Sequence, residues 1–307
     1  MIESFLYSVI ISGTPLLFAT LGEILTEKSG HLNLGVEGLM LLGAVGGFGI
    51  GYVTANPILA ILGGAFVGML GALIYAFLTV SLRANQVVSG LALTIFGTGI
   101  SSYVGTIFVG KKMPEVIIDF FKPFEIPLLS KIPFIGNILF NQDFFIYLSY
   151  IIAISLGIYL YNTRFGLNLI AVGENPSAAD STGINVTLYK YVHIAIGGAL
   201  CGLGGAYLSI VEVPQWQDNI TAGRGWIAIA LVIFASWNPY KAIYAAYIFG
   251  GLNIIGFRMQ NLNFSQNLLD MLPYIVTIIV LVGSSIKKSK NNNPPKGLSV
   301  PYFREER

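Results

Sequence analysis

The segment Tyr161–Lys190, YNTRFGLNLIAVGENPSAADSTGINVTLYK, is a polar stretch that interrupts a chain of long apolar runs. At its centre, Asn175 can cap a helix, Pro176 suits the first helical position, and Gly183 suits the position just after the end. The predicted helix has about seven residues, fewer than the roughly 12–15 that an isolated helix needs in water. It must therefore dock onto something. With apolar runs on both sides, this segment predicts a membrane protein that offers a short helix to a soluble partner.

The composition excludes a soluble fold. The chain has 307 residues, of which 54% are hydrophobic and 10% are charged, whereas soluble domains are about 25% charged. The apolar runs are continuous and lack the two-residue alternation of membrane barrels, so the fold class is all-α, a polytopic integral membrane protein. A span needs about 20 apolar residues. We predict about nine transmembrane helices, with eight to ten as the range, at residues 4–24, 37–55, 57–81, 87–109, 144–161, 191–211, 224–238, 241–257 and 268–286.

Glycines recur at four-residue spacing in several of these spans. Gly43, Gly47 and Gly51 form one such stripe, and Gly198 and Gly202 form another. Small residues at this spacing let the backbones of two membrane helices approach closely. We therefore predict that the stripes are helix-packing surfaces.

Basic residues set the predicted orientation, because cytoplasmic loops are enriched in Lys and Arg. Residues 287–307 form a basic tail and are placed in the cytoplasm, and counting spans back places 162–190 there too. The stretch 110–143 carries balanced charges and falls outside, as does the N-terminus. Residues 1–286 are thus expected to form a single transmembrane domain, followed by the tail. The formal net charge of +2 gives no reason to expect nucleic acid as a partner.

No catalytic or metal site is expected. Cys201 is the single cysteine, which excludes an intrachain disulfide and a cysteine-based zinc site. His31 and His193 occur in no metal-ligand or nucleophile spacing. The stretch Gly105–Lys112 matches the start of a phosphate-binding loop, but Lys112 stands where a Ser or Thr should hold Mg²⁺ and no strand precedes it. If transport is driven by ATP, the ATPase is therefore a separate polypeptide.

Polar residues inside the apolar regions are the candidate pathway residues. Asn33 and Glu37 are four residues apart, which predicts that both lie on one helical face beside a glycine-rich break. Two interpretations remain open for Glu37: a pathway or gate residue, or a first-turn acid favoured by the helix dipole. Gln86 and Ser89 form a second polar patch at a helix start. Asn253 lies within a span, where it either bonds a neighbouring helix or contacts substrate.

Five stretches carry a resemblance to a known family: Leu32–Met40 (LNLGVEGLM), Ala171–Ala179 (AVGENPSAA) with Gly183–Ile184, Thr221–Ala228 (TAGRGWIA), Trp237–Pro239 and Gly297–Arg307 (GLSVPYFREER). The chain resembles permease subunits of bacterial ABC importers in the branched-chain amino acid and simple-sugar permease superfamily. Within it, the chain is most similar to the nucleoside group that works with basic membrane lipoproteins. The likeness spans nearly the whole chain.

The resemblance implies a nucleoside importer in the bacterial cell membrane, with a cytoplasmic C-terminus and no cofactor in this chain. ATP and Mg²⁺ would bind to separate ATPase subunits. The other implied partners are a paralogous second permease, which makes a heterodimer, and an extracytoplasmic substrate-binding lipoprotein. Alternatives are a simple-sugar or branched-chain amino acid permease, and, less favoured, a secondary carrier or channel, which would need membrane-embedded charges. The segment 162–190 then resembles the coupling loop that docks into the ATPase, with these residues implied: Gly173, Glu174, Asn175, Pro176, Ala178, Ala179, Asp180 and Gly183.

Overall fold

The computed structural model describes residues 2–127, 129–130, 132, 135–258, 271–286 and 293–304. In these residues the fold is helical, apart from two short antiparallel strands, β1 (Phe124–Glu125) and β2 (Asn141–Gln142). The all-α prediction is confirmed for this part of the chain.

Six helices of the described residues are long and apolar enough to cross a membrane. Three further helices coincide with the last three predicted spans but are not among these six: α11 (Arg224–Phe234), α12 (Pro239–Arg258) and α14 (Leu272–Ile286). The predicted count of about nine spans is therefore not confirmed. The six are α1 (Ile2–Lys28), α2 (Val36–Thr54), α3 (Pro57–Ala76) extended by η1 (Phe77–Ser81), α4 (Gln86–Gly105) extended by η2 (Thr106–Phe108), α7 (Phe144–Asn162), and α10 (Val186–Tyr207) extended by η3 (Leu208–Glu212).

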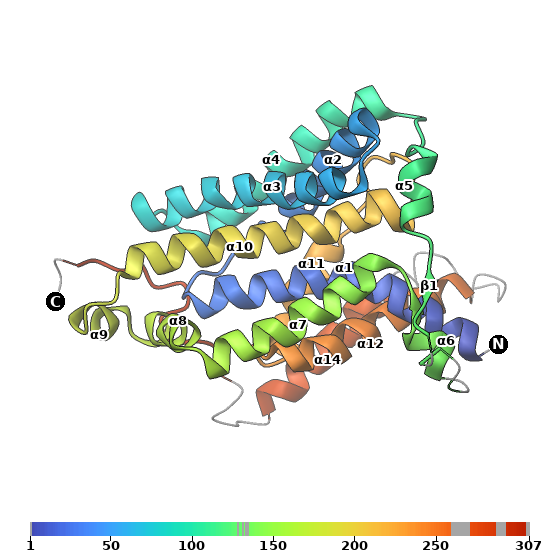
Figure 1. Cartoon of the computed structure of the whole chain (residues 1–307). Helices are drawn as coiled ribbons and strands as arrows, with labels where there is room; N and C mark the ends of the chain where they lie inside the picture. The colour runs from blue at the N-terminus through green and yellow to red at the C-terminus, as the bar shows by residue number, and fades with distance from the viewer. Residues whose placement is uncertain are drawn as a thin grey trace.

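The long helices run between two ends of the molecule (Figure 1). One end carries α8 (Arg164–Glu174), α9 (Pro176–Ser181) and the C-terminal segment, and we call it the α9 end. The other end carries the N-terminus, α5 (Glu115–Phe120), α6 (Ile135–Leu139) and β1, and we call it the α5 end.

The helices α2, α3 and α10 pack through glycines, as the stripes predict. A Cβ added to Gly43 would meet the backbone of Gly202, and one added to Gly68 would meet the backbone of Gly198. A Cβ on Gly205 would meet the carbonyl of Met40. The helix backbones are therefore in direct contact, which maximises van der Waals packing where lipid supplies no hydrophobic driving force between helices.

The connection between α1 and α2 re-enters the bundle. The amide of Leu32 donates to Oε1 of Gln86, the first residue of α4, at 2.8 Å, while Thr94 Oγ1 donates to the Leu34 carbonyl at 2.9 Å. Gln86 and Thr94 are separated by about 12 Å along α4 at 1.5 Å per residue. The helix α2 thus begins about two turns inside the bundle, and irregular backbone at such depth must find its hydrogen bonds within the protein.

Candidate functional site

The polar segment 162–190 forms two helices, α8 and α9, rather than one. The predicted α9 is present: Ala178 N donates to Asn175 Oδ1 at 3.0 Å, Pro176 is the first helical residue, and Gly183 has φ +87°. This left-handed conformation favours glycine after a helix. The caps predicted from the sequence are therefore confirmed.

The helix α8 was missed by the sequence analysis, although two signals mark it. Thr163 Oγ1 accepts a hydrogen bond from Gly166 N at 3.1 Å, which is an N-cap. Leu169 and Val172 are buried three residues apart on one face, as expected for an amphipathic helix.

The helix α9 packs on the protein through an apolar contact at Ala179. Ala179 is 3% exposed and packs with Val172 and Val186 in a small apolar cluster. Ala178 and Glu174 are exposed and face away from the protein's interior. A helix of six residues gains its order from this docking, because it is too short to be stable alone.

Gly173 lies at a tight junction between α8 and two other segments. A Cβ at Gly173 would meet the Lys28 carbonyl at the end of α1. On its other side, the Gly173 carbonyl accepts a hydrogen bond from Gly297 N at 2.8 Å. The role of this residue in the structure is close packing.

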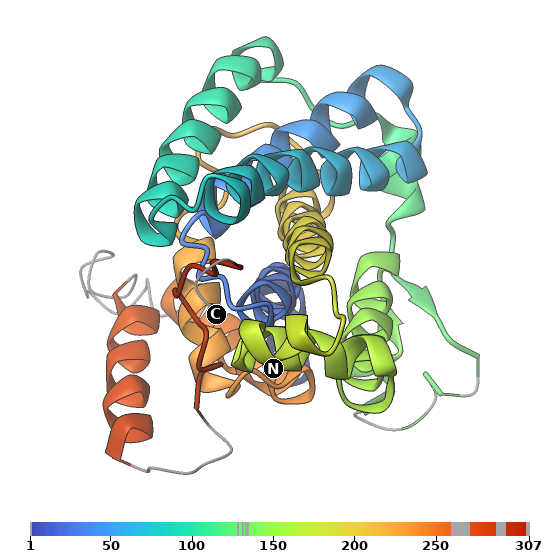
Figure 2. The ribbon, with the colours of Figure 1, turned by 90° about the vertical axis from the view of Figure 1, so that its left-hand side faces the viewer.

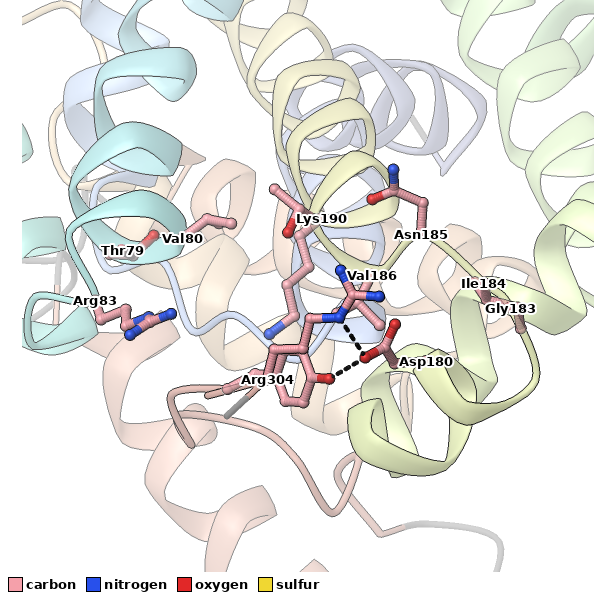
Figure 3. Close-up of a pocket in the computed structure, with 12 residues that line it drawn as sticks. Thr79, Val80, Arg83, Asp180, Gly183, Ile184, Asn185, Val186, Lys190 and Arg304 are labelled. Carbon is pink, nitrogen blue, oxygen red and sulfur yellow. Dashed lines mark hydrogen bonds and ion pairs between the residues drawn. The ribbon is translucent and has the colours of Figure 1, made fainter. Parts of the chain in front are cut away.

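The C-terminal residues 295–304, which we call the tail strap, lie across the α9 end (Figure 2). Ser299 N donates to the Gly30 carbonyl at 3.2 Å. Tyr302 Oη donates to Asp180 Oδ2 at 2.6 Å, and Arg304 Nε lies 3.3 Å from the same oxygen (Figure 3). Asp180 of α9 is thus bonded within the chain, and the strap connects α9 with the α1–α2 connection.

Glu37, the first of the candidate pathway residues, lies elsewhere, where the start of α2 meets the start of α11. Glu37 is 5% exposed and accepts three hydrogen bonds: from Thr221 Oγ1 at 2.5 Å, Gly223 N at 2.9 Å and Gly225 N at 2.6 Å. Because α11 starts at Arg224, this carboxylate caps the N-terminus of α11 while standing in the first turn of α2. The free amides at a helix N-terminus stabilise an anion placed there.

The prediction that Asn33 and Glu37 share a helical face is wrong. The helix α2 begins at Val36, and Asn33 lies in the preceding connection. The Asn33 side chain accepts from Gly35 N at 2.9 Å, a local turn that competes with helix formation. The Asn33 amide donates to Glu23 Oε1 at 2.9 Å, so the connection is held against α1.

The remaining candidates are only partly brought together. Gln86 is buried and holds the Leu32 amide, so it belongs to the same junction. Ser89 is buried and lines an apolar hollow between α3 and α4. Asn253 is half-buried on α12. Within the described residues, Asn253 shares no hydrogen bond with the other four candidates.

One buried acid escaped the sequence analysis. The first span was predicted to end at residue 24, but α1 continues to Lys28 and buries Glu27. Trp237 Nε1 donates to Glu27 Oε2 at 2.5 Å. Because this contact joins residues 210 positions apart, no local pattern reports it.

A helical membrane bundle with a re-entrant connection and a small docked helix at one end is the arrangement that the sequence predicts for a permease subunit. The comparisons agree: the family model described as "Branched-chain amino acid transport system / permease component" matches residues 5–281. The chain belongs to this family. It is a transport subunit of an ABC transporter, without an ATPase site of its own.

Three relatives match over nearly their whole length. TsgC13 of Haloferax volcanii, which by name belongs to a glucose ABC transporter, is 36% identical over 98% of this chain and 97% of its own. The nucleoside ABC transporter permease NupC of Lactococcus lactis is 35% identical, covering 97% of this chain and 96% of that protein. The guanosine ABC transporter permease NupQ of Bacillus subtilis is 34% identical, covering 98% of this chain and 96% of that protein.

Proposed function

We propose that this permease carries nucleosides into a bacterial cell. The supporting observation is that two relatives named for nucleoside and guanosine transport match nearly the whole chain at 34–35% identity. A sugar is the second candidate, because the relative named for glucose transport is as similar, at 36%. Nucleosides contain a sugar ring, so one pathway could suit either class.

We propose further that α9 couples this chain to an ATPase in the cytoplasm. Its outer side, with Glu174 and Ala178, is exposed, while Ala179 fixes it to the bundle. A docked helix of this kind can transmit a push from a partner as a rigid unit. The α9 end also carries Lys28, Arg83 and Arg304, as expected for a cytoplasmic face.

The pathway is proposed to follow the junction where α2 and α11 begin. Irregular backbone at membrane depth occurs where it is buried in protein or lines a water-filled cavity. Here it is anchored by Glu37, Asn33 and Gln86. These residues would then shape a gate, and Ser89 and Asn253 are the candidates for contact with substrate.

The complete transporter is proposed to include a second, paralogous permease, ATPase subunits that bind ATP and Mg²⁺, and an extracytoplasmic lipoprotein that delivers substrate. The test is uptake by proteoliposomes that contain all these components. Tritiated guanosine, uridine, glucose and leucine are each supplied at equal concentration, with and without ATP.

ATP-dependent guanosine or uridine uptake that excess glucose and leucine do not reduce would support the nucleoside assignment. Glucose uptake with no nucleoside uptake would replace it with the sugar assignment. Uptake driven by an ion gradient in the absence of ATP would refute the ATP-coupled mechanism.

A further inference from the structure

A polar cavity of about 350 Å³ lies at the α9 end, between η1, α9, the start of α10 and the tail strap (Figure 3). Three cationic side chains line it, Arg83, Lys190 and Arg304, and they come from three different parts of the chain. One carboxylate, Asp180, also lines it. The described lining residues therefore carry a net charge of +2, in a hollow that opens to the surface beside the exposed Arg83 and Arg304.

Lys190 is the most informative of these groups. It is 4% exposed, and the described residues place no carboxylate within 4 Å of its ammonium group. Its nearest charge-compensating contact is the face of the Tyr302 ring, 5.9 Å away. A buried cation without an anion is strongly unfavourable, so within the part of the chain that the structure describes Lys190 is open to an anionic ligand.

Arg83 is held in an unusual backbone conformation at the edge of the same cavity. Its φ of +58° lies in the left-handed region, which non-glycine residues rarely adopt. Its guanidinium lies 4.5 Å from the centre of the Phe303 ring of the tail strap. Among the described residues it has no carboxylate partner. Such strain clusters at functional sites, although six other non-glycine residues of the described chain also have a positive φ.

Arg304 Nε lies 3.3 Å from Asp180 Oδ2, and a guanidinium carries four further N–H donors besides that of Nε. A guanidinium can hold a phosphate with two parallel hydrogen bonds. The start of α10 also lines the cavity through Asn185, Val186 and Thr187. The positive end of that helix dipole adds to the field of the three cations.

We propose that this cavity binds a phosphate group, as inorganic phosphate or as the terminal group of a phosphate monoester. A phosphate monoester carries a charge of about −1.5 to −2 near neutral pH, which matches the surplus of the lining. The volume is at the lower end of small-ligand sites, roughly 300–1,000 Å³, so a phosphate fits together with a small attached group. The bound phosphate would connect the η1–α4 linker, α10 and the tail strap.

This binding is a property of the isolated chain and does not depend on the transported substrate or on the ATPase. The experiment is calorimetric titration of the purified full-length protein in phosphatidylcholine nanodiscs. Inorganic phosphate and a nucleoside monophosphate are titrated at constant ionic strength, with chloride as the reference anion. We expect saturable binding of at least one phosphate ligand and none of chloride.

Variants locate the site. Arg83→Gln, Lys190→Gln and Arg304→Gln are each expected to weaken binding about tenfold or more, since each removes a charge-assisted hydrogen bond. Arg164→Gln is the matched control, because Arg164 is exposed on α8 and does not line the cavity. Lys190 is buried, so its variant also needs a thermal unfolding curve. The Arg304 side chain is 76% exposed, so its loss tests binding without risk to the fold.

A second series replaces part of the phosphatidylcholine with phosphatidic acid. If the headgroup of phosphatidic acid occupies the site, soluble phosphate should no longer bind in those discs. In Arg304→Gln, only weak binding of soluble phosphate should return. This pair of results would support the site and assign its phosphate to a lipid headgroup. Absence of phosphate binding in both series would overturn the proposal. Phosphate binding that is unchanged in both Arg83→Gln and Arg304→Gln would also overturn it. So would binding of an acidic peptide by a protein that does not bind phosphate.

Discussion

The Glu37 carboxylate in the first turn of α2 accepts a hydrogen bond from the backbone amide of Gly225, 188 residues later in the chain, at 2.6 Å. Gly225 is the second residue of α11, so the side chain of one helix caps the start of another. A Cβ at Gly225 would meet the backbone and the carboxylate of Glu37. The two helices therefore depend on each other where the chain re-enters the bundle.

Replacing Glu37 by Gln should destabilise this junction. A Gln side chain has one acceptor oxygen, whereas the carboxylate uses both of its oxygens to satisfy three donors. At least one buried amide then loses its partner, at a cost of about 1–3 kcal/mol in unfolding free energy. Thermal unfolding in detergent measures the loss. The exposed Glu115→Gln serves as the control and should match the wild type; equal midpoints for all three proteins would contradict this role of Glu37.

Gly173→Ala should loosen the α8–α9 unit. The added Cβ would overlap the Lys28 carbonyl, and such overpacking costs about 1–3 kcal/mol, more than the gain of up to about 1 kcal/mol from better helix propensity. Gly99→Ala provides the comparison, since a Cβ there meets nothing within 4 Å. Protease sensitivity and the unfolding midpoint are the measurements. A Gly173→Ala protein as stable as Gly99→Ala would show that the junction can relax freely.

Gly183→Pro should impair coupling without preventing membrane insertion. Proline requires φ near −65°, whereas Gly183 has φ +87° and its amide donates to the Asp180 carbonyl at 3.0 Å. The end of α9 must therefore change. Gly183→Asn is the matched variant, because Asn tolerates the left-handed region and no heavy atom lies within 4 Å of the added Cβ.

In the reconstituted transporter, we expect Gly183→Pro to lower substrate-stimulated ATP hydrolysis and uptake together. Gly183→Asn should keep most of both activities. Normal uptake by the Pro variant would refute the proposed coupling role of α9.

Asp143 should give the protein a pH-dependent stability. It caps α7 through Ile146 N at 3.1 Å, and burial raises the pKa of its carboxyl from 3.8 to about 6. The folded state therefore holds this proton more tightly than the unfolded state does. Stability should fall as the pH rises from about 4 to about 6, by up to about 3 kcal/mol, and stay lower above that.

Asp143→Asn should remove this decrease, because Asn keeps the cap and has no proton to lose. Unfolding midpoints between pH 4 and pH 8 provide the measurement. Asp119→Asn is the control, since Asp119 is exposed on α5 beside Lys122 and should leave the pH profile unchanged. A wild-type slope that persists in Asp143→Asn would assign the dependence to another group.

Local patterns predicted the parts of the candidate site that depend on neighbours in sequence. The cap of Asn175 on Ala178 and the left-handed conformation of Gly183 depend on residues only a few positions apart. The residue types at these positions are therefore enough to predict both features. The place of Asn33 could not be predicted in the same way, although the predicted span 37–55 begins within one residue of α2. The four-residue spacing of Asn33 and Glu37 suits a helix, but the Asn33 amide is held by Glu23 of α1. A periodic pattern gives no information about such a contact between two segments.

The sequence by itself determined that this protein is a helical membrane protein, because apolar run length and scarcity of charge decide what can cross a bilayer. Its permease class came from the likeness of its motifs to a known family. The sequence also determined where the glycine stripes and the short capped helix lie. Only the tertiary structure decided that Glu37 caps α11, that the tail strap holds Asp180, and that Arg83, Lys190 and Arg304 meet at one cavity. These relationships join segments far apart in the chain, and the hydrogen bonds and charges that define them exist only once the helices have packed.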